Sequence, residues 1–278
     1  MRFSDILKEA FILTWRNRWF WFAGFLIMPQ LIGGYPIDMN FKPGDEFPLK
    51  QFMMLMVFSM GLGVVVLFAA AIIQPALTLA TKSWRLGTPL KGLDALRSGF
   101  PYAGKCLALT LLQIGAFLLV MLMLGVPIVI AFINSIILGA VVALLFIPIL
   151  IVIAFLVAIV VSYAMRNIIL REMTVGDSIS EGWRQFRATK GPSVGLLLTA
   201  ILIPIVAITP LSFPISMAKF AMQLTSVGTT AVTVVFFTVV TILSIPIVGY
   251  FGAFSSVLWT IAFQEWYGDG SSAPNAKF

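Results

Sequence analysis

Long runs of apolar residues, separated by short polar segments, dominate the chain. A membrane-spanning helix needs about 20 mainly apolar residues, and six runs reach that length. They cover residues of about 16–35, 51–81, 106–132, 136–164, 192–217 and 229–264. The pattern predicts an all-α fold, a polytopic membrane protein with six transmembrane helices. We expect a single integral membrane domain over 1–278 that ends in a polar tail at 268–278.

Three short segments precede the first, third and fifth of these runs and resemble one another. Each begins with Asp and has an aliphatic residue two positions later, a small residue five positions later and an aromatic residue after that. The segments are Asp5–Phe11, Asp94–Phe100 and Asp177–Trp183. Each segment, with the two runs that follow it, forms one unit, which predicts three pseudo-repeats in parallel orientation. The predicted units cover about 1–82, 83–165 and 166–267.

The spacing of apolar residues in these segments predicts amphipathic helices that lie flat at the membrane surface. In the first segment, the apolar residues that share one helical face are Phe3, Ile6, Leu7, Ala10 and Phe11. A carboxylate at the start of a helix stabilises the free backbone N–H groups of the first turn. The predicted helix-capping residues are Asp5, Asp94 and Asp177.

The basic residues are distributed very unevenly between the two sides of the predicted membrane domain. If the N-terminus is inside, all but three of the 18 Lys and Arg residues lie on the cytoplasmic side. The three exceptions are Lys42, Lys50 and Lys219. Because cytoplasmic loops carry an excess of Lys and Arg, we expect both termini in the cytoplasm. The expected location is a bacterial-type cytoplasmic (inner) membrane.

The composition confirms the class of protein and restricts its chemistry. Hydrophobic residues make up 60% of the chain and charged residues only 10%, which excludes a soluble enzyme. The chain has no His and one Cys, so the usual general base, metal ligands and disulfide are lacking. We expect no enzymatic activity and no cofactor. The net charge of +7 follows from the membrane orientation, so it predicts no nucleic-acid partner.

Tryptophan and arginine gather on the predicted cytoplasmic side, most densely in segment 15–22. Such residues commonly anchor helices at the interface, and they can also converge on the phosphate of an anionic lipid. The candidate lipid head-group residues are Trp15, Arg16, Arg18, Trp19, Arg97, Arg166, Arg184 and Arg187. The sequence therefore predicts a non-enzymatic integral membrane protein that binds membrane lipid or a membrane-protein partner through this face.

An alternative function is a permease for a small or amphiphilic molecule. Every predicted span contains a proline, which removes a backbone hydrogen bond and can bend a helix. Bent helices can enclose a cavity, although prolines are also common in membrane helices without transport activity. All acidic residues lie outside the spans, which argues against proton-coupled transport.

Three stretches of the chain carry a resemblance to a known group of proteins. They run from Asp5 to Trp21, from Asp177 to Arg187 and from Trp259 to Tyr267, and all are rich in aromatic residues. In these stretches the chain resembles a family of uncharacterised bacterial six-helix membrane proteins, similar to the membrane domain of some glycerophosphoryl diester phosphodiesterases. The resemblance implies a helical membrane fold. It implies no phosphodiesterase activity, because the catalytic domain with its His and acidic metal ligands is absent.

Overall fold

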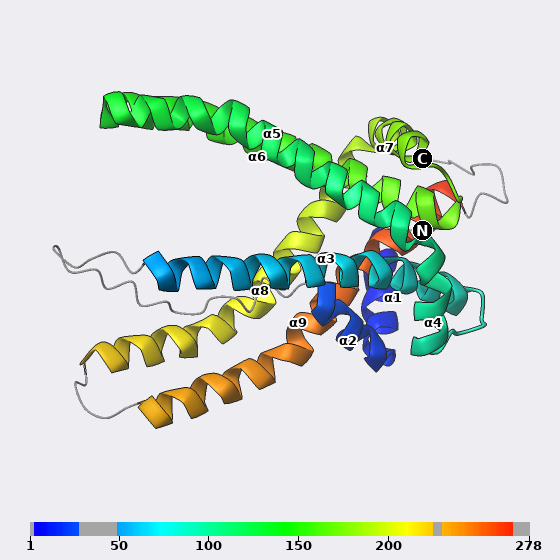
Figure 1. The fold of residues 1–278 in the computed structure, drawn as a ribbon. Helices are drawn as coiled ribbons and strands as arrows, with labels where there is room; N and C mark the ends of the chain where they lie inside the picture. The colour runs from blue at the N-terminus through cyan, green and yellow to red at the C-terminus, as the bar shows by residue number, and fades with distance from the viewer. Residues whose placement is uncertain (1–2, 28–48, 225–229, 269–278) are drawn as a thin grey trace. The chain divides into compact units, whose positions relative to one another are not determined.

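The computed structural model describes residues 3–27, 49–224 and 230–268, and all regular secondary structure in these ranges is helical. The chain contains both short helices and much longer ones (Figure 1). The elements are α1 (Phe3–Arg16), α2 (Arg18–Ile27), α3 (Leu49–Arg85), α4 (Gly92–Gly99), η2 (Phe100–Tyr102), α5 (Ala103–Asn134), α6 (Ile136–Leu170), α7 (Val175–Ala188), α8 (Lys190–Leu224) and α9 (Thr230–Tyr267). The predicted all-α fold is confirmed for the described residues.

Within the described ranges, five helical segments are long and apolar enough to cross a membrane. They are Met56–Arg85, Gly92–Asn134, Ile136–Leu170, Lys190–Ala207 and Ile245–Tyr267. Of the first predicted span, 16–35, the structure describes residues 16–27, which include the ten-residue helix α2. Residues 28–35 of that predicted span lie outside the described residues, as do residue 229 of the last span and 269–278 of the polar tail.

Most of the surface of the long helices α5 and α6 is apolar. Ile137 and Leu144 of α6, for example, are 78% and 75% exposed. A protein surrounded by water rarely exposes continuous apolar surface of this extent, whereas a helix in hydrocarbon exposes it at no cost. The chain therefore has the helices of a membrane protein.

The chain divides into two compact units. The first contains residues 1–99 and 200–258, and the second contains 100–199 and 259–278. The predicted repeats follow the order of the chain, whereas both of these units combine early and late segments, because α8 and α9 each contribute to both.

In the first unit, α2 and α9 approach each other through glycines. A Cβ atom on Gly24 would collide with the carbonyl oxygen of Gly249 and the backbone nitrogen of Ala253. A Cβ atom on Gly252 would likewise collide with the carbonyl oxygen of Gly24. Small residues of this kind let helix backbones come into direct contact, so this contact depends on the absence of side chains.

In the second unit, α5 and α6 run alongside each other as a hairpin (Figure 1). Only Ser135 separates the two helices, and its extended backbone donates its N–H to the Ala131 carbonyl over 3.0 Å. At the other end of the hairpin, α7 packs on α6, where a Cβ atom on Gly182 would lie 2.8 Å from the carbonyl oxygen of Val160.

Hydroxyl groups join the helix ends of the second unit. The Tyr163 hydroxyl lies 2.7 Å from the Ser193 hydroxyl, and Thr189 Oγ1 lies 2.9 Å from Ser193 Oγ. Thr189 also contacts the Tyr267 hydroxyl at 2.8 Å, and Tyr267 donates to the carbonyl of Gln185 over 2.9 Å. Because buried polar groups need partners, this hydroxyl cluster holds α6, α7, α8 and the end of α9 in one arrangement.

The glycine contact between α2 and α9 generates a stability prediction. We expect Gly24→Ala to lower the free energy of unfolding by about 1–3 kcal/mol, because the added methyl group has no space. Thermal unfolding of the purified protein in detergent measures this. Gly61→Ala in α3 is the matched control, since nothing lies within 4 Å of a Cβ atom there. Equal destabilisation by the two variants would contradict the close contact.

Candidate functional site

The N-terminal helix α1 separates its apolar and charged residues. Ile6, Ala10 and Leu13 are buried. Asp5 lies in the first turn and Arg16 in the last, so each charge is stabilised by the helix dipole at its own end. The helix consequently offers a charged edge beside an apolar one.

Asn17 ends α1 and links it to α3. Its side-chain amide N–H donates to the backbone carbonyl of Leu13 over 2.8 Å. Its backbone carbonyl accepts a hydrogen bond of 2.9 Å from the Phe20 N–H, where α2 begins. Its Oδ1 accepts a hydrogen bond of 2.9 Å from the indole N–H of Trp84, near the end of α3. This bond fixes the Trp84 ring beside the last turn of α1.

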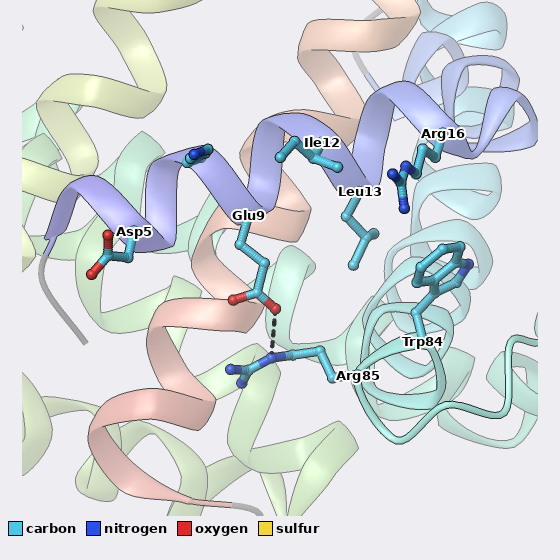
Figure 2. Close-up of a pocket in the computed structure, with 8 residues that line it drawn as sticks. Asp5, Glu9, Ile12, Leu13, Arg16, Trp84 and Arg85 are labelled. Atoms are coloured by element: carbon cyan, nitrogen blue, oxygen red, sulfur yellow. Dashed lines mark hydrogen bonds and ion pairs between the residues drawn. The ribbon is translucent and has the colours of Figure 1, made fainter.

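A pocket of about 440 Å³ lies between α1 and the end of α3, and we name it the α1–α3 pocket (Figure 2). Its lining residues are Asp5, Lys8, Glu9, Ile12, Leu13, Arg16, Trp84 and Arg85. The lining thus combines three cations, two carboxylates, two aliphatic side chains and one indole ring. All of these residues belong to the first unit.

An ion pair crosses the pocket from one helix to the other. Glu9 Oε1 accepts a hydrogen bond of 2.8 Å from Arg85 Nε, and the two side chains are only 27% and 22% exposed. The second carboxylate oxygen of Glu9, Oε2, is buried and accepts no hydrogen bond from the described residues. Within the described part of the chain, only one of the two oxygens of this carboxylate therefore accepts a hydrogen bond.

The charges are ordered along the pocket. Figure 2 shows Asp5 at one end, Arg16 and Trp84 at the other, and Glu9 with Arg85 between them. The aliphatic side chains of Ile12 and Leu13 lie between Glu9 and Arg16. The pocket can thus contact a negative group at its Arg16 end, whereas its other end offers carboxylate oxygens beside the cations of Lys8 and Arg85.

The predicted head-group residues of the first unit do not all lie in the α1–α3 pocket. All three arginines are exposed, but Arg16 lines the pocket and Arg18 and Arg97 do not. The Trp15 ring contacts the rings of Trp21 and Tyr250. The Trp19 ring lies 3.3 Å from where a Cβ atom of Gly92 would be, so it covers the start of α4.

The remaining three candidates belong to the second unit. Arg166 is buried and donates to the carbonyl of Ser162 over 3.2 Å. Arg184 is exposed and forms an ion pair with Glu181. The Arg187 guanidinium lies 5.9 Å from the centre of the Trp183 ring. Each of these three arginines therefore contacts other groups within its own unit.

The three predicted capping residues all lie in first helical turns, Asp5 of α1, Asp94 of α4 and Asp177 of α7. In α7 the N-cap itself is Thr174. Its hydroxyl accepts the Asp177 N–H at 3.3 Å and donates to Asp177 Oδ2 at 2.6 Å. Asp177 is the third residue of the helix, and its carboxylate thus holds the side chain of the N-cap residue Thr174 in place.

Sequence reasoning did not select four of the pocket's polar or aromatic residues, Lys8, Glu9, Trp84 and Arg85. Trp84 and Arg85 follow directly on an apolar run, which is the usual position of interfacial anchors. That signal could have added them to the candidates. Nothing in the sequence pairs Glu9 with Arg85, 76 residues away.

The described residues contain no group of three or more His, Cys, Asp or Glu side chains that could hold a metal ion. Comparison with protein-family models, with curated proteins and with solved structures gives no match to this chain. The pocket's own chemistry is therefore the basis for a functional proposal.

The ion pair across the pocket generates the second prediction. We expect Glu9→Gln and Arg85→Met each to lower the unfolding free energy of the lipid-free protein. The double variant should lose less unfolding free energy than the two single variants lose together. We expect this difference, the coupling energy, to be on the order of 1 kcal/mol for a partly buried pair. Thermal unfolding of the four proteins in detergent measures the coupling. Arg97→Met is the control, because Arg97 is exposed outside the pocket. Strict additivity would mean that the pair contributes nothing.

Proposed function

We propose that this chain is a non-enzymatic, multi-pass protein of a prokaryotic-type cytoplasmic membrane that binds the phosphate-containing head group of a membrane lipid. The observation that carries the proposal is the α1–α3 pocket. It combines cationic donors with an apolar wall at the end of a helix that is long and apolar enough to span the membrane.

The chemistry of the pocket fits the two parts of a phospholipid that meet at the interface. Guanidinium and ammonium groups form charge-assisted hydrogen bonds to phosphate oxygens, and Arg16 and Lys8 supply both kinds. The Trp84 ring and the side chains of Ile12 and Leu13 give the glycerol and upper acyl region an apolar surface. Indole rings favour this depth of the bilayer.

We further propose that the membrane domain has six spans, with α1, α4 and α7 at the cytoplasmic interface and both termini inside. The excess of Lys and Arg on that side supports this orientation. Exposed aromatic rings at Phe11, Phe100 and Trp183, one in each of the three predicted repeats, support interfacial positions for the short helices.

The packing of the short helices supports the proposed threefold repeat. In α4, a Cβ atom on Gly99 would be too close to the backbone of Ala76 in α3. The corresponding residue of α7, Gly182, has the same close approach to α6. Ala10 of α1 is fully buried, and its neighbour Phe11 contacts Tyr250 of α9 with a ring separation of 5.4 Å. Each short helix thus packs on the last long helix of another predicted repeat.

Native mass spectrometry of the protein, extracted in its own lipids with a mild detergent, tests the proposed function. We expect the unaltered protein to retain phospholipid. Arg16→Gln should reduce that retention about tenfold, since it removes charged hydrogen bonds to phosphate.

Arg18→Gln is the matched control, because Arg18 is two residues away and does not line the pocket. It should retain as much lipid as the unaltered protein. A protein that retains no phospholipid would overturn the proposal. Equal losses from the Arg16 and Arg18 variants would also overturn it, because binding would then depend on the general basic charge of the surface.

A further inference from the structure

The two carboxylates in the α1–α3 pocket restrict the kind of head group that it can bind. The pocket places Asp5 and Glu9 beside its three cations, so a ligand that carries both charges finds a partner for each. Glu9 uses one oxygen for Arg85, and its other oxygen is buried without a hydrogen bond from the described residues. A buried charged acceptor that makes no hydrogen bond is energetically unfavourable, so a ligand with N–H donors would gain affinity here.

The order of charges along the pocket indicates how such a ligand would lie. Glu9 and Arg16 are about two helical turns apart on α1, a rise of about 10 Å, and Figure 2 shows Trp84 beside the Arg16 end. A head group with a phosphodiester at one end and a cation at the other matches this order. The phosphodiester would contact Arg16 and the cation would contact Glu9.

We infer, on the basis of the lipid-binding function proposed above, that the α1–α3 pocket selects a phospholipid whose head group carries a primary ammonium, as phosphatidylethanolamine does. The ammonium donates a hydrogen bond to Glu9 Oε2, with Asp5 adding attraction, and the phosphodiester accepts from Arg16. A quaternary choline head group has the same charge but no N–H donor. A glycerol head group lacks the positive charge.

A series of lipids that differ only in methylation of the nitrogen tests this selection. The unaltered protein is incorporated into separate sets of phosphatidylcholine nanodiscs. Each set contains the same fraction of one test lipid, which is phosphatidylethanolamine, its monomethyl form or its dimethyl form. Native mass spectrometry after transfer to detergent then counts the lipid retained. Along this series the number of N–H donors falls while the phosphate and the net charge stay the same. We expect the largest fall in retention, to about a tenth, at the step to phosphatidylcholine alone, because that step removes the last N–H donor.

Glu9→Gln should remove the preference for phosphatidylethanolamine over phosphatidylcholine and leave phosphate-dependent retention in place. Glu181→Gln is the matched control. It removes an ion-paired carboxylate from another short helix, where Glu181 pairs with Arg171 and Arg184 outside the pocket. This control should keep the preference. The methylation series on the unaltered protein still decides the question if the Glu9 variant does not fold.

The outcomes separate the two proposals. Equal retention across the series, or stronger retention of phosphatidylglycerol, would overturn the ammonium selection and leave lipid binding intact. No retained phospholipid of any kind would overturn the proposed function itself. A matched concentration of soluble glycerophosphoethanolamine should displace little lipid, because it makes no contact with Ile12, Leu13 or Trp84. Full displacement would identify a water-soluble ligand and overturn the lipid assignment.

Discussion

A chain segment in hydrocarbon must satisfy its own backbone hydrogen bonds, and the rest of this structure depends on that constraint. The long helices meet it and are apolar on nearly every side, so charge is concentrated at their ends and on α1, α4 and α7. Charged side chains therefore contact one another at the ends of the long helices and on the short helices. The α1–α3 pocket is one such meeting point, and the contacts of Arg171 with Glu181 and Tyr267 form another in the second unit.

Features that depend on neighbouring residues could be predicted from the sequence, and features that depend on distant ones could not. Runs of apolar residues predicted long helices, and the structure has five of spanning length within its described residues. The amphipathic segments predicted short helices, and Arg16 was selected because it lies in a dense Trp and Arg cluster. The Glu9–Arg85 pair and the bond from Trp84 to Asn17 join residues far apart in the chain. No periodicity encodes such contacts, because they depend on how the helices pack.

The hydroxyl cluster of the second unit and the α1–α3 pocket of the first differ in how their buried polar groups are paired. In the second unit the hydroxyl cluster of Tyr163, Thr189, Ser193 and Tyr267 is internally paired, and such networks hold their members in one geometry. In the first unit the pocket leaves a carboxylate oxygen of Glu9 without a hydrogen bond from the described residues. A network of paired hydroxyl groups favours a fixed structure, whereas an acceptor without a hydrogen bond favours the binding of a ligand that can donate one.

The single-residue turn at Ser135 has a consequence for the surrounding bilayer. Helices α5 and α6 contain 32 and 35 residues, which corresponds to lengths of about 48 and 52 Å. The hydrocarbon core of a bilayer is about 30 Å thick, so helices of this length must tilt, extend into the head-group layers or thicken the membrane locally. Because one residue joins them, the two helices cannot adjust independently. Membrane thickness would therefore act on the hairpin as a whole, and a thinner bilayer would tilt both helices together.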